Sequence, residues 1–341
     1  MAKLVTGVEI GSYHIKFAVC NQGNITQLVI EPVPDNLIRE GAIVSWEAMA
    51  DVMKEVIGKH KLTCKQAAIV LPENQMYLRR LTMPLMTVDQ LKVNLPYEFH
   101  DYISEDIDKY FFDYAVIDMI KNEEGEVKQM DLLAAAVKKT TIDQYKTLFR
   151  RAGMKLIAAE PVASVYGKAI RAYRIAHGII GNTSEGNTGD DDYGILDLGH
   201  SSIRIDIYSQ GVYDTTRILE IGCDAITDTI SELYHVDRHI AEVYKQTNQD
   251  NVWEHEACIN TYNNIAIEVM RVMNFYNFNH PDNSLDKLYY CGGGAHITPL
   301  LREISHMIEP ELVGIEELYS KEAGNAEELR AAPAAVAITM E

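Results

Sequence analysis

The stretch Tyr193-Gly-Ile-Leu-Asp-Leu-Gly-His-Ser-Ser-Ile-Arg-Ile-Asp-Ile-Tyr208 decides how the rest of the chain is interpreted. Alternating hydrophobic residues on both sides of a glycine-bearing turn predict a β-hairpin. Asp197 then stands at the end of a buried strand, and the turn after it offers backbone N–H groups and small hydroxyls. Such donors can hold phosphate oxygens, and the carboxylate beside them can hold a metal ion, usually through water.

The beginning of the chain repeats this order of residues. In Val5-Thr-Gly-Val-Glu-Ile-Gly-Ser-Tyr-His-Ile-Lys-Phe-Ala-Val19, Glu9 is followed by an aliphatic residue, a glycine, three turn residues, an isoleucine and the base Lys16. Asp197 is followed by the same classes of residue up to Arg204. An internal repeat at this long spacing predicts two related half-molecules that face each other. Two unrelated hairpins are the alternative.

Length and composition describe a globular protein of two or three domains. The 341 residues are 47% hydrophobic and 24% charged, which allows each domain its own core. The net charge of −19 argues against wrapping nucleic acid or lying unaided on an anionic membrane. It leaves ATP as a possible ligand, because a phosphate site needs only local donors and a metal.

No uninterrupted apolar run is long enough to span a bilayer, and the first residues lack the charged and apolar regions of a signal peptide. We therefore expect a cytoplasmic protein without direct membrane insertion, unless a partner carries it elsewhere. An odd number of cysteines without CxxC spacing predicts reduced, mostly buried thiols. They are Cys20, Cys64, Cys223, Cys258 and Cys291.

Hydrophobic periodicity predicts two lobes and an insertion. The first lobe begins with three strands, an amphipathic helix over 46–60 and a short buried strand over 67–71. Strands and helices of a different texture follow, with a helix after Thr87 that Pro96 kinks or ends. The helix opened by Glu160-Pro161 returns the chain to the first lobe. We assign 1–72 and 152–192 to the first lobe (1A), 73–151 to an inserted α+β subdomain (1C), and 193–341 to the second lobe (2A and 2B, with 2B about 222–286).

A third glycine-rich turn follows the predicted strand Lys287–Cys291. Its residues are Gly292, Gly293 and Gly294. Consecutive glycines after a buried strand let the backbone approach a flat ring or a sugar, because no Cβ intervenes. Two phosphate-binding hairpins and one such turn together predict a nucleotide site between two halves.

This arrangement resembles the actin-like ATPase superfamily, with its two phosphate motifs, two connecting helices and adenosine motif. Glu160-Pro-Val-Ala-Ser-Val-Tyr-Gly167 resembles the first connecting segment, and Ala331 to Ile338 resembles the second. The resemblance implies an α/β chain with the actin-like, ribonuclease H-like two-lobe ATPase fold.

The insertion is similar to the subdomain found in the FtsA and PilM branch of that superfamily, which serves cell division and type IV pilus assembly. The branch's R-x-x-x-P-x-M run appears as Arg80-Leu-Thr-Met-Pro-Leu-Met86. Further runs occur in the order of the family, so the resemblance covers nearly the whole chain. They are Val33–Gly41, Ile221–Thr227, Ala241–Lys245 and Tyr290–Gly294.

The resemblance implies ATP and Mg²⁺ as cofactors and gives each hairpin a role. The first turn would hold β- and γ-phosphate oxygens from one side, through Gly11, Ser12, Tyr13 and His14. The second turn would hold them from the other side, through Gly199, His200 and Ser201. Asp197 would position Mg²⁺ through waters, with Glu9 as the matching acid where relatives often have Asp. The alternative for each turn residue is plain turn chemistry.

Other residues enter the implied site with alternatives of their own. Gly222 and the turn Gly292–Gly294 are counted among the nucleotide contacts. Lys16 would point to the phosphates, or else be a solvated edge lysine. Glu242 and Lys245 would bracket the ribose and adenine, or else form a surface ion pair worth about 0.3–0.5 kcal/mol.

Glu160 is the candidate for orienting the water that attacks the phosphate, and its alternative is an acid that stabilises its own helix N-terminus. Because phosphoryl transfer is mostly positioning and electrostatics, one displaced carboxylate allows binding with slow hydrolysis.

The function implied by the resemblance is that of a cytoplasmic actin-like ATP-binding protein that assembles the inner-membrane platform of a type IV pilus. It would bind the cytoplasmic N-terminal tail of a PilN-like membrane protein beside the insertion and act with other pilus assembly proteins, and a homo-oligomer is one option. Membrane attachment would be indirect, since the C-terminal residues form no basic amphipathic helix.

Two alternatives are a small-molecule, sugar-type kinase and an FtsA-like filament-forming division scaffold. A kinase needs a general base facing a substrate hydroxyl, usually Asp. The sequence has Glu160-Pro161 in that region, a carboxylate better suited to water. ATP-dependent sedimentation would identify the scaffold.

Overall fold

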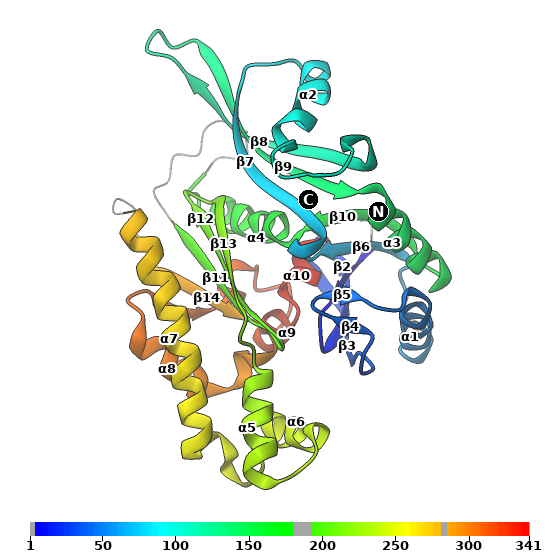
Figure 1. The fold of residues 1–341 in the computed structure, drawn as a ribbon, viewed down its shortest axis with the longest axis vertical. Helices are drawn as coiled ribbons and strands as arrows, with labels where there is room; N and C mark the ends of the chain where they lie inside the picture. The colour runs from blue at the N-terminus through cyan, green and yellow to red at the C-terminus, as the bar shows by residue number, and fades with distance from the viewer. Residues whose placement is uncertain (1–3, 181–191, 281–284, 341) are drawn as a thin grey trace. The chain divides into compact units, whose positions relative to one another are not determined.

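The computed structural model describes residues 4–180, 192–280 and 285–340 of the chain (Figure 1). The chain forms two compact units. The first comprises Met1–Ala169, Ile180–Thr188 and Ala334–Glu341, and the second comprises Ile170–Ile179 and Gly189–Pro333. Among the described residues, no helix has the length and apolar character needed to cross a membrane.

The first unit is built on a five-stranded mixed sheet of order β10-β6-β1-β2-β3. The central strand β1 pairs with β2 in an antiparallel hairpin and with β6 in a parallel ladder, and β6 in turn pairs with β10. The strands are β1 (Leu4–Ile10), β2 (His14–Asn21), β3 (Asn24–Pro32), β6 (Gln66–Leu71) and β10 (Lys155–Pro161).

The second unit contains a sheet with the same connectivity, in the order β13-β12-β11-β14-β15. Its central strand β11 pairs antiparallel with β12 and parallel with β14. The repeat predicted from the two hairpins therefore extends across both sheets. The strands are β11 (Tyr193–Leu198), β12 (Ile203–Ser209), β13 (Val212–Leu219), β14 (Lys287–Cys291) and β15 (Glu311–Gly314).

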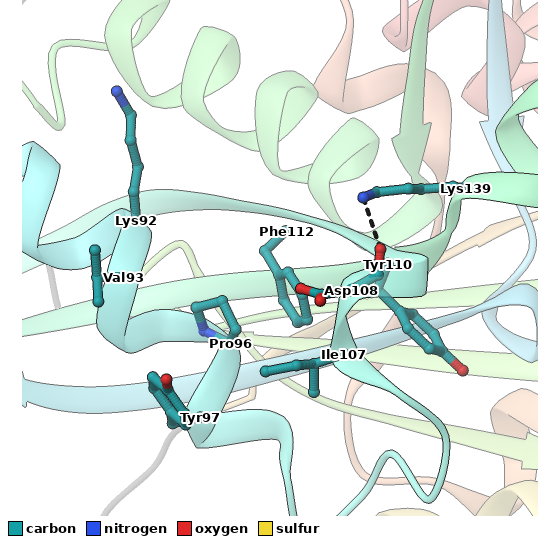
Figure 2. A pocket seen from close by; sticks show the side chains of 9 residues that line it. All are labelled: Lys92, Val93, Pro96, Tyr97, Ile107, Asp108, Tyr110, Phe112 and Lys139. Atoms are coloured by element: carbon teal, nitrogen blue, oxygen red, sulfur yellow. Dashed lines mark hydrogen bonds between the residues drawn. The ribbon is translucent and has the colours of Figure 1, made fainter.

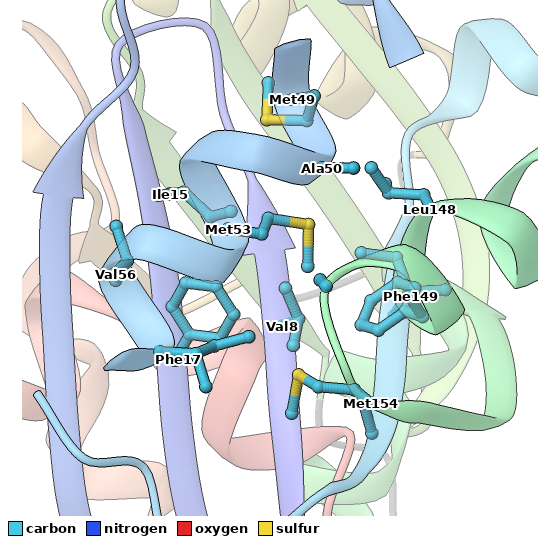
Figure 3. Packing of buried hydrophobic residues seen from close by; sticks show 14 of the residues in the cluster. Val8, Ile15, Phe17, Met49, Ala50, Met53, Val56, Leu148, Phe149 and Met154 are labelled. Atoms are coloured by element: carbon cyan, nitrogen blue, oxygen red, sulfur yellow. The ribbon is translucent and has the colours of Figure 1, made fainter. Parts of the chain in front are cut away.

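Two helices, α1 (Trp46–Lys59) and α3 (Lys139–Arg151), pack their apolar sides into the core of the first unit (Figure 3). In α1 the buried residues recur at three- and four-residue spacing, as an amphipathic helix requires. Ser45 caps this helix by accepting a hydrogen bond from the Ala48 amide. The shorter elements of this region are β4 (Ile38–Arg39), β5 (Ala42–Ile43) and the 3₁₀ turn η1 (Glu73–Gln75).

The insertion has its own three-stranded antiparallel sheet, β7-β9-β8, and its own hydrophobic core. Helix α2 ends at Asn94 and continues as a 3₁₀ turn because Pro96 supplies no amide for the α-helical ladder. Thr87 and Gln90 form a capping box at its start. The elements are β7 (Met76–Pro84), α2 (Val88–Asn94), η2 (Leu95–Phe99), η3 (Ile107–Lys109), β8 (Tyr110–Lys121) and β9 (Val127–Lys138).

Helices of the second unit contribute to one core with the buried side chains of its sheet. All five cysteines of the chain are free and buried, as predicted. The elements are α5 (Asp224–Tyr234), α6 (Arg238–Thr247), η4 (Gln249–Glu254), α7 (Glu256–Asn279), η5 (Gly293–His296), α8 (Thr298–Met307), η6 (Ile315–Leu318) and α9 (Ala326–Ala331).

One helix differs in detail from the sequence prediction. Glu160-Pro161 does not open helix α4 (Val162–Ala176) but ends strand β10, where Glu160 pairs in register with Val70. A proline is tolerated there because β10 lies at the edge of the sheet. The small, apolar segment near the C-terminus forms α10 (Pro333–Ala337), which lies against β1.

That close contact predicts a large penalty for any side chain at Gly7. A Cβ there would lie 1.8 Å from the Ala335 carbonyl oxygen, so backbone has to move. We expect Gly7→Ala to destabilise the protein by at least about 2 kcal/mol in urea unfolding. Gly58→Ala is the control, because nothing lies within 4 Å of its Cβ position in helix α1. That change should stabilise by up to about 1 kcal/mol, and equal effects at the two glycines would contradict the packing described.

Candidate functional site

Each hairpin carries an acid that is paired with a base on the neighbouring strand. Glu9 stands opposite Lys16 in the β1–β2 register, with Nζ 2.7 Å from Oε1. Asp197 stands opposite Arg204 in the β11–β12 register, with the guanidinium 3.4 Å from Oδ2. Less than a quarter of any of these side chains is exposed. The repeat therefore holds at the level of side-chain pairs.

The turn after Asp197 packs tightly against the start of α5. The Cys223 amide donates to the Gly199 carbonyl at 3.0 Å, and the Asp224 amide donates to the His200 carbonyl at 2.9 Å. A Cβ on Gly222 would lie 2.1 Å from that same His200 oxygen. Only glycine fits at this position, and the contact joins Gly222 to the hairpin turn.

The third glycine turn lies directly beside Asp197. Gly292 has φ +91°, and a Cβ there would lie 2.4 Å from Asp197 Oδ1. A Cβ on Gly294 would lie 2.4 Å from Cys223 Sγ. The Cβ position of Gly293 meets nothing within 4 Å, so packing does not explain that glycine. The structure thus brings the hairpin turn, the start of α5 and the glycine turn together around Asp197.

Glu242 and Lys245 form a buried ion pair, so the alternative of an ordinary surface pair is wrong. Lys245 Nζ lies 2.7 Å from Glu242 Oε2 and also donates to Thr227 Oγ1 and to the Cys223 carbonyl. Burial alone raises the pKa of Glu242, but the Lys245 charge and hydrogen bonds from Lys245, Thr227 and Gln246 outweigh it and lower that pKa. The pair ties α6 to the first turn of α5.

The charge of Lys245 also acts on two histidines of the same region. Burial first, and the Lys245 charge second, lower the pKa of His200 in the hairpin turn. Burial also lowers the pKa of His296 after the glycine turn, and Lys245 adds to this effect. Both imidazoles are therefore neutral at pH 7.

The first hairpin provides a matching but simpler arrangement. The Gly11 amide donates to the His14 carbonyl at 2.9 Å and closes the turn, while Ser12 and Tyr13 are half-buried between them. Lys16 is not a solvated edge lysine, because only 13% of its side chain is exposed and it is bonded to Glu9.

One oxygen of Glu9 fits the neighbourhood of a cation. Glu9 Oε2 is buried and has no hydrogen-bond partner among the described residues. A buried carboxylate oxygen without a partner is costly unless a cation or water meets it. No group of three or more His, Cys, Asp or Glu side chains gathers as a metal-ligand set in the part of the chain that the structure describes. A metal here would be held by few carboxylates and by water.

Glu160 lies on the first sheet at the level of Glu9. Ile69 of β6 is in register with Val8 on one side and with Ala159 on the other, which places Glu9 and Glu160 two strands apart. Two strand spacings amount to roughly 10 Å. Glu160 Oε1 accepts from Lys168 Nζ at 2.8 Å. Glu160 is a residue of strand β10 and stands directly before the Pro161 that precedes α4.

Asp206 was not among the residues predicted for the site, although it contacts the base that pairs with Asp197. This residue is fully buried next to Arg204, which donates to it from Nε at 2.9 Å. The alternating order Arg204-Ile-Asp206 on one strand was the available signal, since residues two apart share a face of the sheet.

A separate hollow of about 260 Å³ lies in the insertion (Figure 2). Aromatic and aliphatic side chains form much of its wall, and Lys139 donates to the Asp108 carbonyl at its edge. Two of its lining residues, Val93 and Tyr97, are each 63% exposed. The lining residues are Lys92, Val93, Pro96, Tyr97, Ile107, Asp108, Tyr110, Phe112 and Lys139.

Comparisons with known proteins agree with this architecture. The model of the family described as type IV pilus assembly protein PilM matches residues 7–326. A solved PilM-PilN type IV pilus biogenesis complex is similar with a TM-score of 0.76 and 19% identity, over 100% of this chain and 98% of that one. The fold is that of the actin-like ATPases, as the motifs predicted.

Two further solved structures share the fold at low identity. Ethanolamine utilization protein EutJ from Carboxydothermus hydrogenoformans has a TM-score of 0.58 and 16% identity, covering 95% of this chain and 89% of that one. MreB 5 of Spiroplasma citri bound to AMPPNP has a TM-score of 0.51 and 11% identity, covering 93% of each chain.

The buried pair of α6 predicts a large effect of removing its base. Lys245→Met leaves Glu242 buried without a counter-ion, and we expect a loss of about 3 kcal/mol in urea unfolding at pH 7. Because the pKa of Glu242 is lowered, the pair stabilises fully above its ordinary value of 4.5, and that contribution is lost as pH falls through the lowered pKa. The loss caused by Lys245→Met should therefore shrink in acid.

The matched control is Arg271→Met, which breaks an exposed pair with Glu268 at the same three-residue spacing. It should change stability by less than about 0.5 kcal/mol. If both variants behave alike, the pair in α6 is not buried as described.

Proposed function

This chain belongs to the family of type IV pilus assembly protein PilM, and on that premise we propose that it binds ATP and links nucleotide binding to assembly of the pilus platform. Its ligand is ATP with Mg²⁺, and its partner is the cytoplasmic N-terminal tail of a PilN-like membrane protein. The protein acts in the cytoplasm and reaches the inner face of the membrane through that partner.

The observation that carries the nucleotide role is the convergence around Asp197. Three segments that are distant in sequence contact one another there, at Gly199, Gly222 and Gly292. Because these residues are glycines, no Cβ atom covers the backbone at these positions. Glycine turns of this kind let phosphate oxygens approach the backbone closely. The open space at Gly293 suits a sugar or a flat base.

The remaining candidates take roles around the same ligand. Gly11, Ser12, Tyr13 and His14 hold the phosphates from the first unit, as Gly199, His200 and Ser201 do from the second. Lys16 and Glu9 belong to the same phosphate-binding hairpin as Gly11 to His14. Asp197 positions the metal through water, and the metal, when bound, neutralises the phosphate charge. Glu242 and Lys245 lie on one side of the ribose and adenine. The turn of Gly292, Gly293 and Gly294 contacts the same part of the nucleotide.

Glu160 is the residue that orients the attacking water. Its carboxylate is held by Lys168 at 2.8 Å. Because phosphoryl transfer depends on positioning, a carboxylate that is held by another partner orients the water less well, so hydrolysis is slow compared with binding and the bound nucleotide acts mainly as a switch.

The insertion provides the docking place for the partner's tail. Its hollow is lined by aromatic, aliphatic and charged side chains, and Val93 and Tyr97 are exposed, which suits an extended peptide with both apolar and charged residues. A solved complex of PilM with PilN supports a partner of this class. The comparisons favour neither a sugar-type kinase nor a division scaffold.

Asp197→Ala tests the nucleotide role. In the presence of Mg²⁺ the variant should bind ATP at least about tenfold more weakly by isothermal titration calorimetry, because the metal loses its positioning carboxylate. Glu311→Ala, an exposed acid on β15 of the same unit, should leave the affinity unchanged. Unchanged affinity in Asp197→Ala would remove the metal role assigned to that residue.

Changes in the hollow test the partner role. The double variant Val93→Asp and Tyr97→Asp should weaken binding of a fluorescent N-terminal peptide of a PilN-like protein by roughly thirtyfold, about 2 kcal/mol. Both side chains are exposed, so folding and ATP affinity should not change. Phe278→Asp serves as control, because this residue is 85% exposed but belongs to the second unit. Equal peptide affinity in all three proteins would place the tail elsewhere.

A further inference from the structure

Arg204 is held between two carboxylates. Its Nε donates to Asp206 Oδ2 at 2.9 Å, and its NH2 group lies 3.4 Å from Asp197 Oδ2. The contact with Asp206 is the shorter one, so the guanidinium is anchored on Asp206 and extends toward Asp197. Only 17% of the Arg204 side chain is exposed.

The anchor itself is fixed by a chain of hydrogen bonds. Asp206 is fully buried, and its other oxygen accepts from Thr216 Oγ1 at 2.6 Å. Thr216 Oγ1 in turn accepts from the Tyr213 hydroxyl at 3.0 Å. A buried carboxylate held in this way fixes the position of the guanidinium that neutralises it.

The first hairpin shows that the fold does not need this anchor. Lys16 pairs with Glu9 as Arg204 pairs with Asp197, but the residue two places after Lys16 is the buried Ala18. An acid–base pair across the hairpin therefore forms without a second acid. Asp206 on β12 has no counterpart in the first hairpin. It holds Arg204 beside Asp197.

Building on the nucleotide role proposed above, we propose that Arg204 is a positioning residue that supplies the counter-charge of Asp197. Metal-free ATP would bring its negative phosphates close to the negative Asp197 carboxylate. The repulsion between these charges is strong, because they are a few ångströms apart in a partly buried site. The guanidinium offsets this charge when no cation is present. With Mg²⁺ bound, the cation does so instead. Arg204 therefore sets how strongly nucleotide binding depends on the divalent cation.

The test is ATP affinity measured by calorimetry in Mg²⁺ and again in EDTA, for the full chain and its variants. Wild-type protein should lose less than about tenfold in affinity when Mg²⁺ is removed. Arg204→Ala should lose at least about tenfold more than wild type in EDTA, and much less in Mg²⁺. Arg204→Lys keeps the charge and should restore most of the EDTA affinity.

A purely structural role for Arg204 predicts equal losses in both buffers, and that result would overturn the proposal, as would no loss in either. Arg217→Ala is the control, since Arg217 is an exposed base on the neighbouring strand β13. It should leave both affinities unchanged, and a matching shift there would also refute a specific role for Arg204. If wild-type protein binds ATP in neither buffer, the proposed function itself fails, which is a distinct result.

Discussion

An acid at the end of a central strand, paired with a base on the next strand, is the interaction on which both units depend. A carboxylate that is mostly removed from water needs a partner, and the hairpin supplies one at a fixed register position in each sheet. In the second unit, Gly199 follows the acid by two residues and has no room for a side chain. The Ser202 carbonyl oxygen would lie 2.5 Å from a Cβ at that position. Each unit therefore combines the end of a central strand, an acid–base pair and a tight turn in the same order.

The parts of the structure that follow from local signals were predictable. Alternation around Gly11 and Gly199 gave both hairpins, and their shared order of residues implied the related sheets that the structure shows. The residues of different character after 72 have a separate sheet and a separate core in the structure, and Pro96 marked the end of an α-helix. Each of these signals lies within a few residues of the feature that it determines.

What was missed depends on residues that meet only after folding. Glu242 and Lys245 resemble a surface pair on one helix, and their burial follows from Thr227 and the Cys223 carbonyl on another. Asp206 becomes notable only because β13 brings Thr216 against it. Glu160 stays in a strand because of its pairing with β6, which overrides the helix-opening preference of the proline after it.

We propose that the turns of the two duplicated hairpins bind the same triphosphate. Amide hydrogen exchange of the full chain, with and without Mg²⁺ and AMPPNP, tests it most directly. We expect exchange in the turns at 11–14 and 199–202 to slow together over the same range of nucleotide concentration, because one ligand contacts both turns. Slower exchange in one turn while the other keeps its rate at saturating nucleotide would contradict it.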